Sequence, residues 1–156
     1  MPERVIENSV LIQCSPRELY DYVTQPWRWH EWHPSSASAK ASADVMSVGE
    51  RFSEVIHLRP LPWLPLVIQR KTEYRVEMAE RGCFWQVSGV TDSGALTIRY
   101  DLTYENGVDE SSGTRFNRRL KYRVSGTMQL LEPMLYPQMK RLSLVALENL
   151  RNKLER

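Results

Sequence analysis

The segment from Gly126 to Arg156 constrains the fold most, because it is the one long stretch in which apolar residues recur with helical spacing. Its apolar side chains fall on one side of a helix, and its charged side chains fall mostly on the other. The stripe consists of Met139, Leu142, Ala146, Leu147, Leu150 and Leu154. A stripe of this length needs a large apolar surface to cover it. It is either ordinary core or one wall of a ligand cavity, and the pattern leaves both interpretations open.

The chain before this helix is mostly strand-like and can supply the covering surface. Strands are predicted over 5–13, 51–59, 66–78, 83–91, 95–104 and 114–124. Glycine, proline, aspartate or asparagine lies at each break between the later strands, as hairpin loops require. Five consecutive strands on short loops predict an antiparallel meander that wraps around a helix over 138–154.

Two prolines, Pro133 and Pro137, fall at the beginning of the long helix. A proline inside a helix lacks the N–H that would bond the carbonyl group four residues back. We therefore expect a kink or a delayed start of the helix near Pro137.

Two short helices are predicted between the first strand and the meander. Ser15 is suited to cap the first of them, and Glu18 completes a capping box three residues later. The second is predicted within 27–34, where tryptophans are dense. Trp29 and Trp32 are expected to turn inward and to close one end of the sheet.

The size and charge of the chain limit the classes of partner. Its 156 residues fit a single domain, 1–156, with a sizeable core. A net charge of +2 is too close to neutral to indicate a nucleic acid partner. No apolar run is long enough for a transmembrane segment, and the N-terminus lacks the order of a signal peptide, so a cytoplasmic protein is expected. The sequence names no protein partner.

Metal binding is considered at the three histidines, because imidazole is a common zinc ligand. His30 and His33 are spaced to share a helix face, and His57 is available elsewhere in the chain. An HExxH motif is absent, and no cysteine lies near these residues. We therefore predict no metal site and no cofactor, and we interpret the tryptophan-rich segment as an aromatic plug.

Several short motifs along the chain resemble those of one known superfamily. They are Ser15-Pro16-Arg17-Glu18-Leu19-Tyr20, Pro26-Trp27-Arg28-Trp29, Trp32-His33-Pro34, Gly113-Thr114-Arg115, Leu130-Leu131-Glu132-Pro133 and Ala146-Leu147-Glu148-Asn149-Leu150. With the order of predicted elements, they make the chain resemble the START-like (SRPBCC) superfamily, and specifically its polyketide cyclase/dehydrase branch. The likeness spans nearly the whole chain. It implies an α+β helix-grip fold, in which a curved antiparallel β-sheet wraps around a long C-terminal α-helix.

For function, the resemblance implies a deep cavity between the sheet and the final helix that holds a hydrophobic small molecule. Relatives bind lipids, sterols, hormones or polyketides, and a minority catalyse cyclisation or dehydration. Such proteins share no catalytic signature, so the resemblance assigns no catalytic residue.

Alternation along the strands identifies the side chains that face this cavity. Large or sulfur-containing side chains are frequent among them. They include Tyr74, Met78, Cys83, Trp85, Tyr100, Tyr104 and Tyr122. Inward tyrosine hydroxyls need hydrogen-bond partners, which a polar ligand or water can supply. The alternative is a filled core in which the hydroxyls bond to one another.

Glu54 and Arg70 are charged residues predicted to face inward. If Arg59 pairs with Pro65 across the intervening loop, Glu54 lies directly opposite Arg70. Neighbours of this kind are close enough for an ion pair. We favour a structural pair between them. The alternative is a register that is off by one residue, which would turn these charges to solvent.

Arg118 is a third inward charge, in a strand where its inward neighbours are apolar or aromatic. If Tyr104 pairs with Thr114 across the next loop, Arg118 lies beside Tyr100. A buried arginine needs a partner. We predict that Arg118 orients a carboxylate, carbonyl or phenolate group of a ligand.

Three functions fit these features, and the sequence does not decide among them. The first is a carrier or sensor that binds a lipid-, polyketide- or aromatic-like molecule. The second is a cyclase or dehydratase, for which Glu54 is the only inward carboxylate in the strands. The third is a protein-interaction module that uses the proline-broken apolar loop 61–65.

Candidate ligand-binding residues follow from these inward faces and from the expected entrance to the cavity. Trp63, in the loop, and the Trp29–Trp32 segment are expected to border that entrance. The full set is Trp29, Trp32, Glu54, Trp63, Arg70, Tyr74, Trp85, Tyr100, Arg118, Tyr122, Met139 and Leu142.

Overall fold

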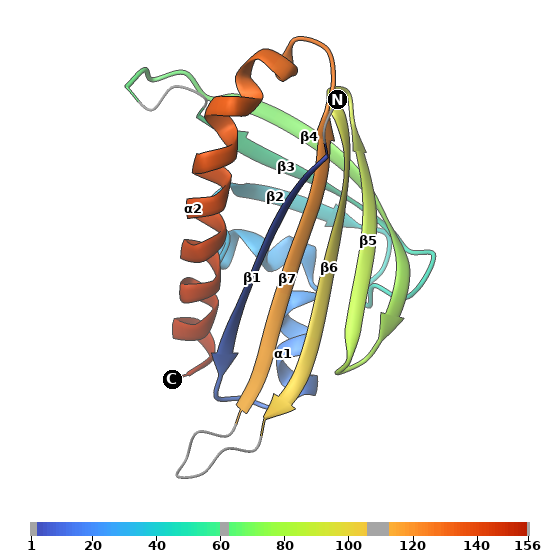
Figure 1. Ribbon diagram of the computed structural model, residues 1–156. Helices are drawn as coiled ribbons and strands as arrows, with labels where there is room; N and C mark the ends of the chain where they lie inside the picture. Colours follow the sequence, from blue (N-terminus) through green and yellow to red (C-terminus); the bar gives the residue numbers. More distant parts are fainter. Residues whose placement is uncertain (1–2, 60–62, 106–112, 156) are drawn as a thin grey trace.

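A computed structural model describes residues 3–59, 63–105 and 113–155, whose arrangement is shown in Figure 1. In chain order the elements are β1 (Arg4–Ile12), α1 (Pro16–Val23), the 3₁₀ helix η1 (Pro26–Glu31), β2 (Ser36–Ala41), β3 (Arg51–Leu58), β4 (Ile68–Glu80), β5 (Phe84–Thr91), β6 (Gly94–Glu105), β7 (Gly113–Val124) and α2 (Met128–Leu154). Every predicted strand forms, with ends that differ by one or two residues from the prediction.

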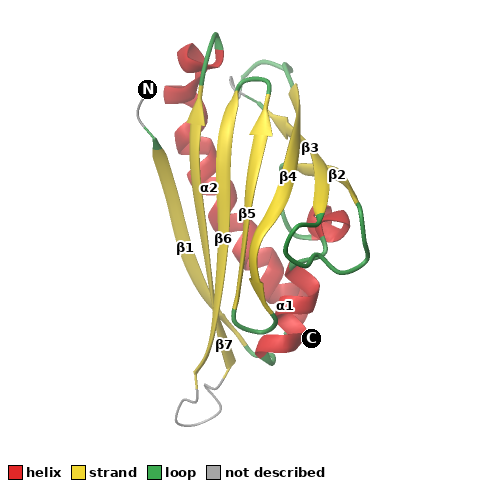
Figure 2. Cartoon of the chain, turned by 90° about the vertical axis from the view of Figure 1, so that its right-hand side faces the viewer, coloured by secondary structure: helices red, strands yellow, loops and turns green. Residues whose placement is uncertain are grey.

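The strands form one antiparallel sheet in the order β1-β7-β6-β5-β4-β3-β2. The strands β3 to β7 pair consecutively, as the predicted meander requires, and β1 pairs with β7. The sheet is curved, and α2 runs along its concave side (Figure 1, Figure 2). The predicted α+β helix-grip architecture is therefore confirmed.

The helices α1 and η1 follow the first strand, as predicted. The Ser15 side chain accepts a hydrogen bond from the Glu18 backbone N–H at 3.2 Å, which caps α1. The second helix, η1, is a short 3₁₀ helix that ends before the predicted segment 27–34 does. Trp29 and Trp32 are both buried, so their predicted inward orientation is confirmed.

The long helix α2 begins at Met128, well before the predicted range 138–154. Pro133 and Pro137 lie inside it, so the prediction of a delayed start is wrong. Buried contacts of Met128 and Glu132 hold these first turns in the helix although both prolines lack an N–H donor. In Figure 1 the first turns lean away from the axis of the remaining helix, which the prolines explain. None of the helices in the described residues has the length and apolar character needed to cross a membrane.

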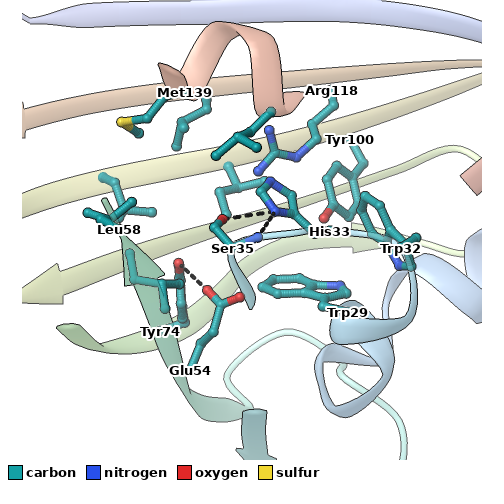
Figure 3. Close-up of a pocket in the computed structure, with 15 residues that line it drawn as sticks. Trp29, Trp32, His33, Ser35, Glu54, Leu58, Tyr74, Tyr100, Arg118 and Met139 are labelled. Atoms are coloured by element: carbon teal, nitrogen blue, oxygen red, sulfur yellow. Dashed lines mark hydrogen bonds between the residues drawn. The ribbon is translucent and has the colours of Figure 1, made fainter. Parts of the chain in front are cut away.

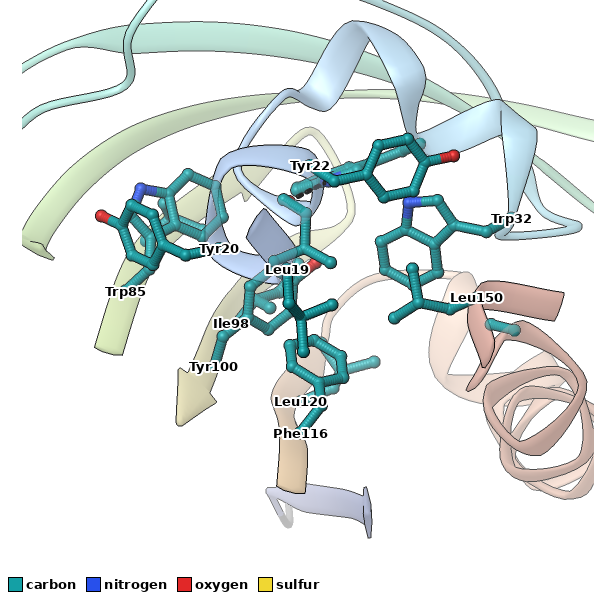
Figure 4. Close-up of a cluster of buried hydrophobic side chains, with 14 of the residues drawn as sticks. Leu19, Tyr20, Tyr22, Trp32, Trp85, Ile98, Tyr100, Phe116, Leu120 and Leu150 are labelled. Carbon is teal, nitrogen blue, oxygen red and sulfur yellow. Dashed lines mark hydrogen bonds between the residues drawn. The ribbon is translucent and has the colours of Figure 1, made fainter. Parts of the chain in front are cut away.

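An aromatic cluster forms the centre of the core (Figure 4). Trp85 is wholly buried and stacks on Tyr100, with ring centroids 5.4 Å apart. Tyr100 in turn meets Phe116 edge-on at 5.0 Å. Leu150 of α2, also wholly buried, reaches toward Trp32 in Figure 4. Around Leu150, near the C-terminal end of α2, the apolar stripe is therefore ordinary core.

Three residues predicted to face inward do not. Met78 is 41% exposed and Tyr104 is 56% exposed, and Cys83 is exposed as well. A β-bulge between Val76 and Met78 shifts the alternation near the end of β4. Tyr104 lies near the end of β6 and Cys83 lies in the turn before β5, and at such positions period-two alternation no longer implies a buried face.

Candidate functional site

A cavity of about 80 Å³ lies between the concave side of the sheet and α2 (Figure 3). We call it the polar compartment, because charged and hydrogen-bonding side chains meet there. Residues from the η1 region, β3, β4, β6, β7 and α2 line it. They are Trp29, Trp32, His33, Ser35, Glu54, Ile56, Leu58, Tyr74, Leu96, Ile98, Tyr100, Arg118, Leu120, Met139 and Leu142.

Arg118 is the buried cation of the polar compartment. It lies in β7 opposite Tyr100 of β6, which confirms the register predicted for this hairpin. The residue is 6% exposed, and its Nε has no hydrogen-bond partner among the residues that the structure describes. A buried guanidinium with an unpaired N–H is unfavourable unless another group in the cavity accepts the bond. The geometry thus leaves one donor of Arg118 for a group that enters the cavity.

Glu54 of β3 is the buried carboxyl group of the polar compartment. It is 5% exposed, and the Tyr74 hydroxyl donates to its Oε1 at 3.1 Å. Burial raises the pKa of Glu54, while contacts with Ser36 and Tyr74 and the charge of Arg118 act in the opposite direction. Burial and the charge of Glu54 also raise the pKa of Tyr74. Glu54 is consequently protonated more easily than an exposed glutamate.

The predicted ion pair between Glu54 and Arg70 is wrong. Glu54 lies opposite Thr72, and Arg70 lies opposite Ile56, so the register of β3 and β4 is two residues away from the predicted one. The Nε of Arg70 donates instead to the Ser93 hydroxyl at 3.3 Å. A shift by two residues preserves the alternation of faces, which is why both residues still line a cavity.

His33 also belongs to this site, although its spacing from His30 suggested only a metal ligand. The Ser35 backbone N–H donates to His33 Nδ1 at 3.3 Å, and the Ser35 hydroxyl oxygen lies 2.9 Å from the same atom. Because a backbone N–H can only donate, Nδ1 accepts, and the neutral ring carries its proton on Nε2. Burial and the charge of Arg118 lower the pKa of His33 to about 3, so the imidazole is neutral at neutral pH. Its neighbour Trp32, predicted to face inward, is the signal that could have placed His33 here.

The structure gathers most of the candidate residues at two adjoining cavities. Those that line the polar compartment are Trp29, Trp32, Glu54, Tyr74, Tyr100, Arg118, Met139 and Leu142. Arg70 and Tyr122, with Met139, line a second cavity of about 70 Å³, which we call the apolar compartment.

Trp63 and Trp85 line neither compartment. Trp85 is held inside the aromatic cluster, where its ring stacks between Phe52 and Tyr100. Trp63 is 72% exposed in the loop between β3 and β4. Residues 61 and 62 of that loop lie outside the described residues. In the described part of the chain, no group of three or more histidine, cysteine, aspartate or glutamate side chains is placed to hold a metal ion.

The polar compartment brings three kinds of chemistry into one small space. It holds an arginine with an unpaired N–H, a carboxyl group with a raised pKa and a neutral imidazole. Within aromatic and aliphatic walls, an arginine of this kind can bind a carboxylate, carbonyl or phenolate oxygen of a hydrophobic molecule. A carboxyl group and an imidazole are also groups that transfer protons in general acid–base catalysis.

Comparison with known protein families gives a match over nearly the whole chain. Residues 3–155 match the family model described as polyketide cyclase / dehydrase and lipid transport. None of the curated proteins matches the sequence.

Solved structures share the fold at low sequence identity. The Zhui aromatase/cyclase from Streptomyces sp. R1128 is 9% identical with a TM-score of 0.70, over 99% of this chain and 95% of that chain. The di-domain ARO/CYC protein BexL from the BE-7585A biosynthetic pathway is 12% identical with a TM-score of 0.71, over 99% of this chain and 50% of that chain. TTHA0849 from Thermus thermophilus is 14% identical with a TM-score of 0.71, over 97% of both chains. At these identities the likenesses show the fold alone.

Proposed function

The chain belongs to the polyketide cyclase / dehydrase and lipid transport family, as its START-like resemblance implied, and on this premise we propose that it is a carrier or sensor of a hydrophobic small molecule. The ligand is lipid-, polyketide- or aromatic-like. It lies in the polar compartment, with a carboxylate, carbonyl or phenolate oxygen at Arg118.

The unpaired Nε of Arg118 is the observation that carries this proposal. An exposed arginine bonds to water, whereas this one is buried in a compartment with aromatic and aliphatic walls. Glu54 shares the compartment and accepts from Tyr74, and burial raises its pKa, which weakens its competition with a ligand for the charge of Arg118.

The test compares Arg118→Met with Arg119→Met. Both variants remove one charge from β7 and keep the aliphatic stem, but Arg119 is exposed on the opposite face of the sheet. Benzoate serves as the probe, and its binding is followed by the fluorescence of Trp29 and Trp32, which line the compartment. We expect Arg118→Met to weaken binding by roughly tenfold or more, as loss of a hydrogen bond to a charged group does, and Arg119→Met to change it little. Equal, small effects from both variants would contradict the proposal.

Native mass spectrometry of freshly purified protein complements this test. A co-purified small molecule identifies the natural ligand class and supports the carrier or the enzyme function. A clean apo mass together with a captured protein partner supports the third function, the interaction module. Trp63 and Leu64 of that loop are exposed, and the rest of its apolar segment, residues 61 and 62, lies outside the described residues.

A cyclase or dehydratase is the second candidate function. One observation favours it: burial raises the pKa of Glu54, so the polar compartment holds a carboxyl group that can act as a proton donor. The test is incubation with a poly-β-ketone thioester, followed by mass spectrometry. Loss of water from the substrate supports the enzyme, and unchanged substrate that binds to the protein supports the carrier.

A further inference from the structure

The apolar compartment adjoins the polar compartment and shares part of its wall. It reaches the turn between β5 and β6 and the first turns of α2. Five side chains, all apolar, line both compartments: Ile56, Leu58, Leu96, Leu120 and Met139. In Figure 3, Met139 and Leu58 lie at the side of the polar compartment that is far from Trp32. These five side chains therefore lie where the two spaces meet, and we call this place the passage.

The residues that line the cavity on β7 and those that line it on α2 place the two compartments in the same order. On β7, Arg118 lines the polar compartment, Leu120 lines both, and Tyr122 lines the apolar compartment. On α2, the shared methionine lies between Leu142 of the polar compartment and Leu135 of the apolar one. From Arg118 to Tyr122 the strand advances about 13 Å at its usual rise. The two compartments thus lie in line along β7 and α2.

Two charged residues of the apolar compartment, Glu132 and Arg70, already have partners, and a third, Arg123, is exposed to solvent. Glu132 accepts from Arg4 Nε at 2.7 Å and from the Tyr122 hydroxyl at 3.2 Å. Arg70 bonds to the Ser93 hydroxyl. Arg118 differs, because its Nε is unpaired. A ligand's anionic or carbonyl group therefore has a free cationic donor at one end of the line. The other end offers mostly apolar walls, paired charges at Glu132 and Arg70, and one unpaired hydroxyl group, that of Thr72.

We propose that the apolar compartment is a tail site, which takes a single unbranched acyl or alkyl chain whose acidic or carbonyl head lies at Arg118. The inference rests on the proposed function and adds the class of ligand. Two small spaces of about 80 and 70 Å³ that lie in line suit one extended chain better than a fused ring system. A chain that starts at Arg118 passes the five shared side chains and ends near Leu135 and Tyr122.

The experiment measures the affinity of a series of straight-chain carboxylates from butyrate to dodecanoate. Each methylene group that enters the tail site is expected to tighten binding roughly fourfold, until the chain fills the compartment. Met139→Trp narrows the passage and should abolish this gain, so that this variant binds dodecanoate no more tightly than it binds butyrate. Leu144→Trp is the matched control, because Leu144 lies on the same helix and is 57% exposed. Leu96→Phe narrows the passage from the β6 side and replaces Met139→Trp if that variant does not fold.

The outcomes separate the tail site from the proposed function. Alkanols of the same lengths test the tail without a charged head. If affinity does not rise with chain length in either series, the tail-site proposal is wrong. It is also wrong if affinity rises as much in Met139→Trp and Leu96→Phe as in the parent. If alkanols show the gain but carboxylates bind no better in the parent than in Arg118→Met, the tail site stands and the role of Arg118 is wrong.

Discussion

Glu54 is the residue whose chemistry depends most on its surroundings. Its pKa is raised in the folded protein, chiefly by burial, so the folded state holds the proton more tightly than the unfolded chain does. The stabilisation from that proton is fully present below the unfolded pKa of about 4.3, and it is lost as the pH rises through the folded pKa. At neutral pH the carboxyl group therefore makes the fold less stable than a neutral group of the same shape would.

Glu54→Gln is expected to gain stability relative to the parent as the pH rises. The amide has the same shape, can still accept from Tyr74 and does not ionise. The difference in the free energy of unfolding should be flat below about pH 4 and should grow above it, which denaturant titrations at a series of pH values measure. Glu73→Gln, at an exposed position of β4, is the matched control. A difference that does not depend on pH would show that Glu54 is not held in the way we describe.

At the scale of elements, α2 combines two roles along one stripe. Leu150 is wholly buried in the core, whereas Leu142 lines the polar compartment. The same leucine-to-alanine change therefore has different consequences at the two positions, because one creates a new void and the other enlarges an existing space.

Leu150→Ala is expected to lower the free energy of unfolding by about 2–5 kcal/mol, as cavity-forming substitutions in a filled core do. Leu142→Ala should cost less than about 2 kcal/mol, since the space beside it is already present. Denaturant unfolding of both variants measures the difference. Equal losses would mean that Leu142 is filled core and that the cavity does not extend to it.

The elements also show what the sequence could predict and where it failed. The loop between β6 and β7 has the length that the prediction assumes, so Arg118 lies beside Tyr100 as expected. The loop between β3 and β4 is longer than assumed, so the predicted partner of Glu54 is wrong although its face is correct. His33 lies between η1 and β2, where no repeating pattern predicts whether a side chain faces the core or solvent. The early start of α2 depends on tertiary contacts around Glu132, which local propensity does not contain.

At the scale of the whole molecule, contacts between the first strand and the last helix fasten the two ends of the chain together. Arg4 Nε donates to Glu132 at 2.7 Å, and the Ser143 hydroxyl donates to Asn8 Oδ1 at 2.8 Å. The Arg4 pair holds the first turns of α2, which contain both prolines and cover the apolar compartment.

Arg4→Met should loosen these first turns while the rest of α2 stays protected. Amide hydrogen exchange, read by mass spectrometry, is expected to quicken in residues 128–137 and to remain unchanged after residue 143. Arg81→Met removes an ion pair with Asp21 of similar geometry at the other side of the molecule and serves as the control. Unchanged exchange in Arg4→Met would mean that packing alone holds the segment.

The pairing of β1 with β7 determines the order in which the molecule can assemble during translation. Residues 4–12 leave the ribosome early, yet their partners are residues 114–122. The hairpins from β3 to β7 can close as they emerge, because each strand pairs with its neighbour in sequence. Until α2 follows, their concave surface is uncovered and open to non-productive association with other nascent chains. Enclosure of the binding space is therefore a late event of biosynthesis, and a molecule present at that moment can be enclosed without having to enter through a gate.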